Sequence, residues 1–543
     1  MASYNLSELF EVIVDASAPD REALVVGDGR RLTYRHLDER ATRLANHLRE
    51  AGIGRGDHIG LQLLNGSEYV EAMLAAFKLS AVPVNVNYRY VEKELAYLYG
   101  DADLKALLYH RSMAPRVAAA APDISGLDHF IHVDDEGSGE APVAGSVEYE
   151  AALAAASPER TFSGRSSDDV YIAYTGGTTG MPKGVMWRCE DIFFGAMGGG
   201  DVFQTGDVVS SPDELATRMP EAGLVILPTP PFMHVSAHWG AFMGFFGGGK
   251  VVIVPHGRFD PGTIWSLVDR EAVNILIVVG DAMAVPLADE FDVSGPYGLP
   301  GLIVIGSGGA VLSPTNKERL AALKEGLMII DGMGSSEMGA IGTKATAGGE
   351  KATGPQFAVN AQTAVLDDDL RRIEPGSDTV GQLARTGHIP LGYYGDVDKT
   401  ATTFVTDPEG TRWALAGDMA QVAEDGTVVL LGRGSVSINS GGEKVYPEEV
   451  EVAVRHHPAI ADVLVVGVPD DRWGSRVVAV ASLRSGESLT LPELESVCRD
   501  HLAGYKVPRH LIVVDEVVRS PSGKADYRWA KQTALDALGV GGG

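Results

Sequence analysis

The sequence is short of cysteine, of basic residues and of long apolar runs. Its two cysteines, Cys189 and Cys498, lie far apart among 543 residues. This excludes a disulfide framework and a zinc-binding spacing, and it predicts a reducing, cytoplasmic compartment. The most apolar segments, such as residues 273–280, are far shorter than the ~20 residues of a membrane-spanning helix. The chain begins without a basic region followed by an apolar one, so no signal peptide is predicted.

Basic residues are outnumbered by acidic ones. The chain has 45 Lys and Arg against 73 Asp and Glu, a formal net charge of −28. This charge argues against nucleic acid and anionic membranes as general partners, although a local basic pocket for a phosphate ligand remains compatible with it. The hydrophobic fraction of 45% and the charged fraction of 22% are ordinary for a globular protein. The length predicts about two to four domains.

Apolar strands alternate with amphipathic helices along most of the chain. This alternation predicts parallel sheets that are covered on both faces. Strands are expected at 58–64, 81–84, 224–227, 251–254, 275–279 and 302–305, and helices at 37–48, 68–79, 260–271 and 314–324. From about 354 to 431, short strands and turns predict a smaller, mainly β unit. Residues 436–543 have their own pattern of helices (447–456, 491–502) and strands (462–467, 476–483, 510–514), which predicts a small α+β domain.

Residues 174–184 read Tyr-Thr-Gly-Gly-Thr-Thr-Gly-Met-Pro-Lys-Gly and follow a strand-like segment. Glycines let backbone N–H groups approach an anion closely, threonines add hydroxyl donors, and Lys183 adds positive charge. Lys183 is followed by Gly184, so the spacing is not that of a Walker P-loop. A flexible surface loop is the alternative, but the residue types favour a site for a polyphosphate.

Four further motifs follow in order: Met333-Gly-Ser-Ser-Glu337, Ala416-Gly-Asp418, Arg433 at a glycine-rich linker, and Arg519-Ser-Pro-Ser-Gly-Lys524. In the first of them a glycine turn is expected directly after a strand at 327–331. Together with the 174–184 loop they resemble the motifs of the adenylate-forming superfamily, which includes acyl-CoA synthetases, nonribosomal peptide adenylation domains and firefly-type luciferases. The resemblance runs from about residue 32 to residue 524. Residues 184–188 and the run from Arg433 are most similar to bacterial long-chain and steroid side-chain acyl-CoA synthetases.

The resemblance implies an α/β fold in three parts. Residues 1–432 would form an N-terminal adenylation domain of two doubly wound α/β subdomains and a small β-barrel-like unit. Residues 433–435 would be a hinge, and residues 436–543 a mobile C-terminal lid.

The resemblance also implies a two-step ligase that uses ATP, Mg²⁺ and coenzyme A. A carboxylate attacks the α-phosphate of ATP, and the charge on the phosphates must be neutralised during this step. The expected catalytic residues are Lys524, Lys183, Glu337 and His234, and the expected Mg²⁺ ligands are Glu337 and Thr178. The nucleotide would be bound by Thr175, Gly176, Gly177, Thr178, Thr179, Gly180, Lys183, Gly308, Gly309, Ala310, Asp331, Gly332, Met333, Gly334, Ser335, Ser336, Asp418, Arg433 and Lys524.

The acceptor and the acid are predicted from weaker similarities. Gly442 matches a position that lines the pantetheine tunnel, and Trp473, Tyr505 and Arg509 match positions that contact the CoA nucleotide, although an ordinary core Trp and a surface Arg are the alternative. His234, His238, Gly280 and Asp281 are expected at the acyl pocket. A hydrogen-bonded structural role is an equal alternative for His234.

Two positions depart from the family pattern, and several alternatives stay open. Met333 replaces the usual aromatic residue against adenine, and Ser435 replaces the usual Asp or Lys of the hinge. The predicted acid is a hydrophobic fatty or steroid side-chain acid. The alternatives are an aryl or medium-chain acid CoA ligase, an adenylating enzyme with a non-CoA acceptor, and an ATP-binding regulatory protein. A homodimer is compatible with the sequence.

Overall fold

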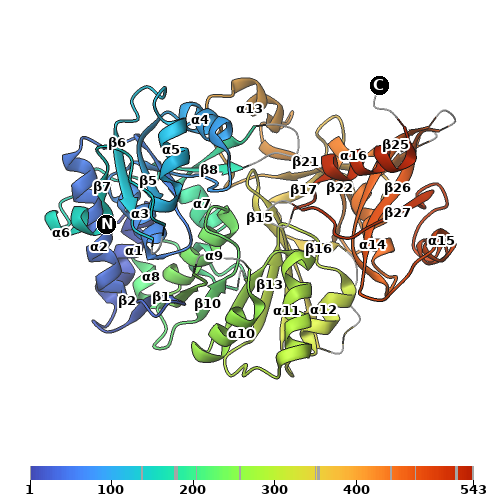
Figure 1. The fold of residues 1–543 in the computed structure, drawn as a ribbon, viewed down its shortest axis with the longest axis horizontal. Helices are drawn as coiled ribbons and strands as arrows, with labels where there is room; N and C mark the ends of the chain where they lie inside the picture. The colour runs from blue at the N-terminus through green and yellow to red at the C-terminus, as the bar shows by residue number, and fades with distance from the viewer. Residues whose placement is uncertain are drawn as a thin grey trace.

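The computed structural model describes residues 2–135, 138–175, 181–203, 205–255, 259–348, 350, 355–440, 443–470, 473–519 and 524–540. Two sheets and their helices build the large N-terminal domain, and a smaller domain lies beside them at the C-terminal end of the chain (Figure 1). Within these described ranges, no helix is long and apolar enough to cross a membrane.

The first sheet has a parallel centre. Its strand order is β19-β9-β8-β4-β3-β5-β6-β7, and β3 pairs in parallel with both β4 and β5. All of β3 is buried, as expected for a strand with helices on both faces. The strands are β3 (His58–Gln62), β4 (Val82–Asn85), β5 (Leu104–His110), β6 (His129–Val133), β7 (Val147–Glu148), β8 (Val170–Thr175), β9 (Lys183–Arg188) and β19 (Gly392–Tyr393).

The second sheet is mixed. Its strand order is β17-β18-β21-β22-β16-β15-β14-β13-β12-β10-β11-β1-β2, with β20 paired to β21. The pairs from β11 to β14 are parallel, and those from β14 onward to β17 are antiparallel. The strands are β1 (Glu22–Val26), β2 (Arg31–Thr33), β10 (Val225–Pro228), β11 (Lys250–Ile253), β12 (Ile275–Val278), β13 (Val304–Gly308), β14 (Met328–Ser335), β15 (Gly339–Ala347), β16 (Gln356–Val359), β17 (Thr363–Leu366), β18 (Gly381–Arg385), β20 (Phe404–Thr406), β21 (Arg412–Val422) and β22 (Val428–Arg433).

Two features of the second sheet differ from the sequence-based expectation. The mainly β part is continuous with the α/β part, because β16 pairs with β15 on one side and with β22 on the other. Strand β14 also runs past Asp331 to Ser335, where a glycine turn was expected, because it pairs with β15 along this length. Both features depend on pairing between distant segments, which local patterns do not show.

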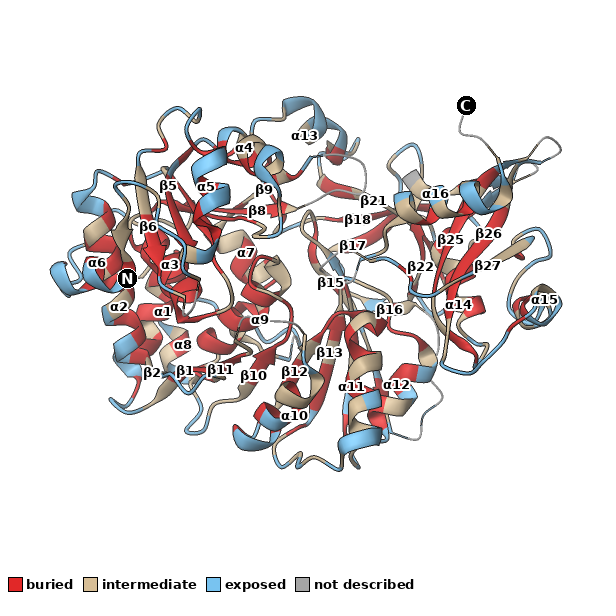
Figure 2. Cartoon of the chain, in the orientation of Figure 1, coloured by how far each residue is buried: buried red, intermediate tan, exposed pale blue. Residues whose placement is uncertain are grey.

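Helices cover the two sheets and leave most strands buried between them (Figure 2). They are α1 (Leu6–Ala16), α2 (Tyr34–Glu50), α3 (Ser67–Lys78), α4 (Glu92–Asp101), α5 (Ala114–Ala120), α6 (Tyr149–Ala155), α7 (Cys189–Gly195), α8 (Glu214–Arg218), α9 (Val235–Phe246), α10 (Pro261–Arg270), α11 (Gly280–Ser294), α12 (Pro314–Ala321) and α13 (Val397–Thr403).

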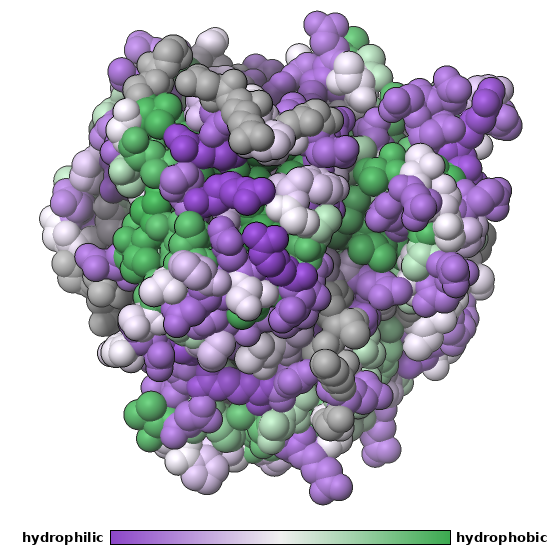
Figure 3. All heavy atoms as spheres, turned by 90° about the vertical axis from the view of Figure 1, so that its right-hand side faces the viewer, coloured by the Kyte–Doolittle hydropathy of each residue, from purple (hydrophilic) through white to green (hydrophobic). Residues whose placement is uncertain are grey.

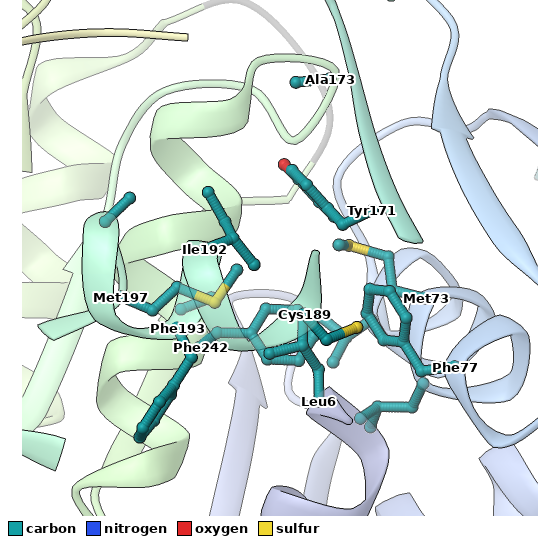
Figure 4. Close-up of a cluster of buried hydrophobic side chains, with 14 of the residues drawn as sticks. Leu6, Met73, Phe77, Tyr171, Ala173, Cys189, Ile192, Phe193, Met197 and Phe242 are labelled. Atoms are coloured by element: carbon teal, nitrogen blue, oxygen red, sulfur yellow. The ribbon is translucent and has the colours of Figure 1, made fainter. Parts of the chain in front are cut away.

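The largest core joins the two sheets. Leu6 of α1, Phe77 of α3, Cys189 of α7 and Phe242 of α9 meet in it (Figure 4). Cys189 is a free thiol among these apolar side chains, and burial raises its pKa. This packing fixes the two sheets relative to each other.

The C-terminal domain is a small sheet with helices on both faces. Strand β25 presents Val463 and Val465 to the core with α14 and α15, and presents Leu464 to the core with α16. Alternate side chains of a strand point to opposite faces, so one apolar strand serves both cores. The elements are β23 (Ile438–Ser440), β24 (Glu443–Val445), α14 (Pro447–Val454), β25 (Ile460–Asp470), β26 (Gly474–Leu483), α15 (Leu491–Arg499), β27 (His510–Val514) and α16 (Tyr527–Leu538).

The surface on the C-terminal side is mostly hydrophilic. Figure 3 shows clusters of hydrophobic atoms set among more extensive hydrophilic side chains on this side. This agrees with the large excess of charged acidic residues in the sequence.

Candidate active site

A cavity of about 1010 Å³ lies where the two sheets and the C-terminal domain meet. The N-terminal domain contributes the carboxyl ends of β13 and β14 and one side of α9, and the C-terminal domain contributes residues 436–439, 465–467 and 524–528. Ligands of open α/β sheets bind at the carboxyl ends of the strands, where loops leave a crevice.

The glycine- and threonine-rich segment connects β8 to β9. Thr175 ends β8 and lines the cavity, and it pairs across the hairpin with Lys183, the first residue of β9. Gly176, Gly177, Thr178, Thr179 and Gly180 lie outside the described residues. The Lys183 ammonium donates a hydrogen bond to Asp396, and this bond lowers the pKa of the Asp396 carboxyl. The structure therefore gives Lys183 a carboxylate partner that the sequence did not reveal.

The ends of β13 and β14 form a wall of the cavity with little side-chain bulk. Gly308, Gly309 and residues 332–336 line it. Gly308 and Gly332 are paired across the two strands, and a Cβ on Gly308 would lie 3.3 Å from the carbonyl oxygen of Gly332. Backbone is thus the surface offered to a ligand here. Met333 also lines the cavity and is only 7% exposed.

Two residues predicted for nucleotide binding lie behind this wall. Ala310 and Asp331 are not among the lining residues. The Asp331 carboxylate is buried and lies 2.7 Å from the Lys317 ammonium of α12. Burial raises the pKa of Asp331, and Lys317 opposes the rise. Asp331 therefore joins α12 to β14 and does not face the cavity.

Asp418 and Arg433 are paired residues on β21 and β22. The Arg433 Nε lies 3.4 Å from the Asp418 Oδ1. Burial raises the pKa of Asp418, Arg433 lowers it, and Glu337 raises it further. The Glu337 carboxylate accepts a hydrogen bond of 2.9 Å from the Tyr393 hydroxyl of β19. The Asp418 carboxylate of β21 and the Glu337 carboxylate of the turn between β14 and β15 are thus held close enough to interact electrostatically.

Lys524 brings the C-terminal domain into this charge cluster. It lines the cavity, and burial together with Arg433 lowers the pKa of its ammonium, whereas Glu337 and Asp418 raise it. The four predicted residues Glu337, Asp418, Arg433 and Lys524, which lie far apart in sequence, are therefore electrostatic neighbours. A cation that lines a cavity and is surrounded by charges of both signs is typical of a site that binds a charged ligand.

His234 lies beside this cluster, at the N-terminus of α9. It lines the cavity, and burial followed by the charges of Lys524 and Arg89 lowers its pKa to about 3. Its Nε2 atom has no hydrogen-bond partner among the residues that the structure describes. The ring is therefore neutral at neutral pH and available to a ligand in the cavity.

The deep part of the cavity is apolar. Its floor consists of residues on neighbouring strands β12, β13 and β14, and its roof is one side of α9. Gly306 belongs to this floor, and a Cβ built on it would meet no heavy atom within 4 Å. The lining includes Trp239, Gly240, Met243, Ile275, Ile277, Val304, Gly306 and Ile330.

Three residues predicted at the acyl pocket are placed elsewhere. His238 is buried, with Nδ1 3.0 Å from the Tyr171 hydroxyl and Nε2 in contact with the Phe232 carbonyl oxygen. Burial lowers its pKa to about 4, so it is a neutral core residue. Gly280 and Asp281 begin α11 and do not line the cavity. The Asp281 carboxylate instead accepts hydrogen bonds from Ser313 and Asn316.

Three of the four residues predicted for CoA lie outside the cavity in this structure. Trp473 and Tyr505 are 44% and 40% exposed, and Arg509 is also exposed. Gly442 lies outside the described residues. The prediction that these residues bind CoA is therefore neither supported nor opposed by the cavity.

Sequence reasoning did not identify Tyr393 or Asp396. Asp396 is 213 residues from its partner Lys183, and it reaches Lys183 because β19 pairs with β9. No local motif marks such an approach. The sequence contains only one hint of this strand pairing, which is the short strand-like segment Gly392-Tyr393 that follows a proline.

Two family profiles match the chain. The profile of the AMP-binding enzyme family matches residues 12–394, and the profile of the AMP-binding enzyme C-terminal domain matches residues 449–524. The chain belongs to the AMP-binding enzyme family. The first match contains the cavity wall of the N-terminal domain, and the second contains Lys524.

Curated relatives are similar over nearly the whole chain. The 3-oxocholest-4-en-26-oate–CoA ligase of Rhodococcus rhodochrous is 49% identical over 540 residues, which cover 98% of this chain and 96% of that protein. The medium/long-chain-fatty-acid–CoA/3-oxocholest-4-en-26-oate–CoA ligase of Mycobacterium tuberculosis is 47% identical over 97% of this chain and 96% of its own length. The names of these relatives match the group that residues 184–188 and the run from Arg433 resemble, the bacterial long-chain and steroid side-chain acyl-CoA synthetases.

Solved structures share the fold. The anthranilate CoA ligase AuaEII in complex with anthranoyl-AMP superimposes with a TM-score of 0.84 at 21% identity, covering 99% of both chains. ATP-bound MatB from Rhodopseudomonas palustris gives a TM-score of 0.82 at 24% identity, covering 99% of this chain and 100% of that one. The predicted fold class, with a large N-terminal and a small C-terminal domain, is confirmed.

Proposed function

We propose that this member of the AMP-binding enzyme family is an AMP-forming acyl-CoA synthetase. The observation that carries the proposal is that Lys524 of the small domain lines the same cavity as the glycine-rich ends of β13 and β14 and interacts with Asp418 and Arg433. A nucleotide and a carboxylic acid would meet in this cavity, and acyl-AMP would form there with release of pyrophosphate. CoA would then take the acyl group and release AMP.

In the first step the chain's own residues orient and neutralise the nucleotide. Asp418 is suited to accept hydrogen bonds from the two ribose hydroxyls, and Arg433 to donate to the ribose or a phosphate. The Lys524 ammonium would lie against the α-phosphate and the attacking carboxylate, where negative charge concentrates in the transition state. Lys183 and the threonine-rich segment would hold the outer phosphates. Lys183 would then either leave Asp396 or interact with both Asp396 and the phosphates.

Mg²⁺ would be held between Glu337 and phosphate oxygens, and it would supply charge neutralisation at the phosphates. The residues fit this role, because the Glu337 carboxylate is fixed by Tyr393 and interacts with Asp418. Within the described part of the chain, no group of three or more His, Cys, Asp or Glu side chains could hold a metal alone.

In the second step the small domain would rotate about residues 433–435. Lys524 would serve the first step from the cavity, whereas Trp473, Tyr505 and Arg509 are exposed on the same domain. A rotation would withdraw Lys524 and bring Gly442 to the acyl-AMP, with Trp473, Tyr505 and Arg509 on the CoA nucleotide. The hinge, a homodimer and a cytoplasmic location stay predictions from the sequence.

The acid would be a hydrophobic fatty or steroid side-chain acid. The apolar floor and the space above Gly306 support a bulky apolar acyl group. The names of the relatives from Rhodococcus rhodochrous and Mycobacterium tuberculosis point to the same class of acid.

A panel of acids tests this function. Fatty acids of short, medium and long chain, an aryl acid and a steroid side-chain acid are incubated with ATP, Mg²⁺ and CoA, and AMP and the thioester are measured. We expect equal amounts of AMP and thioester, with the highest kcat/KM for a long-chain or steroid side-chain acid. Sustained AMP formation without CoA would indicate another acceptor, and no acid-dependent AMP with any acid would refute the function.

A further inference from the structure

Asp281, which does not line the cavity, joins the two domains. The Arg455 Nη1 of the C-terminal domain lies 3.4 Å from the Asp281 Oδ2 of the N-terminal domain. Both side chains are nearly buried, with exposed fractions of 6% for Arg455 and 10% for Asp281. An ion pair that is withdrawn from water is sensitive to the loss of either partner, because the remaining charge is left uncompensated.

The N-terminal domain holds Asp281 rigidly. Asp281 lies in the first turn of α11, where the helix dipole favours a negative charge. Its Oδ1 accepts hydrogen bonds of 2.9 Å from the Ser313 backbone N–H and from the Asn316 side chain. Oδ1 is therefore hydrogen-bonded within the N-terminal domain, whereas Oδ2 interacts with Arg455 of the C-terminal domain.

On the other side, Arg455 is connected to the segment that carries Lys524. Arg455 donates to the Asp462 carboxylate at 3.0 Å, and Asp462 accepts a second hydrogen bond of 2.8 Å from Arg519. Arg519 in turn forms a β-bridge with Ala525, the residue after Lys524. A continuous series of polar contacts thus runs from α11 of the large domain to the backbone beside the cavity lysine.

We propose that the Asp281–Arg455 pair is a positioning contact that holds the small domain in the orientation of the first half-reaction. The inference rests on the proposed two-step function. The pair acts through Arg519 and Lys524 and does not touch the reacting atoms. Rotation of the small domain for the second step breaks the pair, so the pair favours acyl-AMP formation selectively.

Two variants break the contact from opposite sides. Asp281→Asn keeps an acceptor for Ser313 and Asn316 but removes the charge that faces Arg455. Arg455→Met keeps much of the side-chain length and leaves Asp462 paired with Arg519. Asp289→Asn is the matched control, because it lies on the same helix and removes a 2.6 Å ion pair with Arg319 that stays within the large domain.

Each half-reaction is measured separately in single turnover. Pyrophosphate release without CoA reports acyl-AMP formation, and thioester formation from supplied acyl-AMP reports the second step. We expect both variants to slow the first step by about tenfold or more and to leave the second within about twofold of wild type. The double variant should be no slower than the slower single variant, Arg455→Lys should restore part of the first step, and Asp289→Asn should change neither.

The possible outcomes separate the positioning role from a merely structural one. An equal loss in both steps, matched by a lower thermal midpoint, would mean that the pair only stabilises the fold and would overturn the proposal. An unchanged first step in either folded variant would also overturn it. If wild-type protein formed no acyl-AMP from any acid, the proposed function itself would fail, which is a distinct result.

Discussion

The proposed chemistry of the cavity depends on one ammonium group, that of Lys524. Lys524 is surrounded by the carboxylates of Glu337 and Asp418 and by the guanidinium of Arg433, and burial lowers its pKa. The carboxylates oppose this shift. A charge that is already desolvated and oriented interacts strongly with a charge that develops on a bound phosphate.

Replacement of Lys524 separates the two half-reactions. For Lys524→Ala we expect acid-dependent pyrophosphate release to fall by about 100-fold to 1000-fold, since one positioned charge is lost from the transition state. Thioester formation from supplied acyl-AMP should largely survive, because the proposed role of Lys524 is confined to the first step. Lys93→Ala, at an exposed position of α4, is the control. Equal loss of both steps in Lys524→Ala would contradict this division.

Among single residues, the sequence identified those that belong to motifs. Gly308, Met333, Asp418, Arg433 and Lys524 were predicted from the sequence, and the structure brings them to one cavity or its charge cluster. The environment of a residue outside a motif was not predictable. His238 is neutral in the core because Tyr171 and Phe232 contact it, and these contacts come from packing between distant segments.

At the scale of elements, three neighbouring strands determine the shape of the proposed acyl chamber, which is the apolar part of the cavity. Strands β12, β13 and β14 present one face to the cavity, and Gly306 lies between Ile277 and Ile330 in this face. Since a Cβ on Gly306 would meet only open space, a side chain there would extend into the chamber without displacing the sheet.

A graded series at Gly306 tests the chamber. We expect Gly306→Leu to lower kcat/KM for a steroid side-chain acid by about 10-fold to 100-fold and Gly306→Ala to lower it less, because the added side chains occupy acyl space. The KM for ATP should not change, and short-chain acids should be affected least. The same loss for every acid, together with a higher KM for ATP, would place Gly306 at the nucleotide instead.

Helix α14 carries a buried carboxyl group to the predicted hinge. Glu448 accepts a 3.5 Å hydrogen bond from the backbone N–H of Arg433, and its Oε2 is shielded from solvent with no hydrogen-bond partner among the described residues. Burial raises the pKa of Glu448 from 4.5 to about 8, and the neighbouring Glu451 contributes to the rise. The folded protein therefore keeps this proton at pH values where the unfolded chain loses it.

The pH dependence of stability follows from this shift. A raised folded-state pKa contributes stability that is fully present below pH 4.5 and is lost as the pH rises toward 8. Glu448→Gln removes this titration. We therefore expect the free energy of unfolding of the variant, relative to that of wild type, to increase progressively between pH 5 and about pH 8.5. Glu487→Gln, at an exposed position, should show no such trend. Parallel profiles for wild type and Glu448→Gln would show that Glu448 does not titrate in this range.

Elements were predictable where apolar periodicity is strong. Helix α2 and strands β3, β10 and β27 lie where the sequence predicted them, because each has its own pattern of buried positions. The extension of β14 and the link through β16 were not predictable, because they depend on pairing with strands distant in sequence. The contact of Asp281 was not predictable for the same reason, because its partner Arg455 lies 174 residues away in another domain.

At the scale of the whole molecule, two domains share one cavity. Strands from the large domain supply a backbone wall and an apolar floor, and the small domain supplies Lys524 and a polar side. The fold class followed from the motifs and is supported by structures that superimpose over 99% of the chain. A shared cavity of this kind suits a reaction that needs dry surroundings in one step and access for a second substrate in the next.

The fate of the carboxylate oxygen tests the account most directly. The protein is incubated with ATP, Mg²⁺, CoA and an acid from the panel whose carboxylate carries ¹⁸O at both positions, and AMP and pyrophosphate are analysed by mass spectrometry. If the acid is activated at the α-phosphate, AMP will contain one ¹⁸O atom per molecule and pyrophosphate none. Unlabelled AMP, or ¹⁸O in pyrophosphate or inorganic phosphate, would contradict the account.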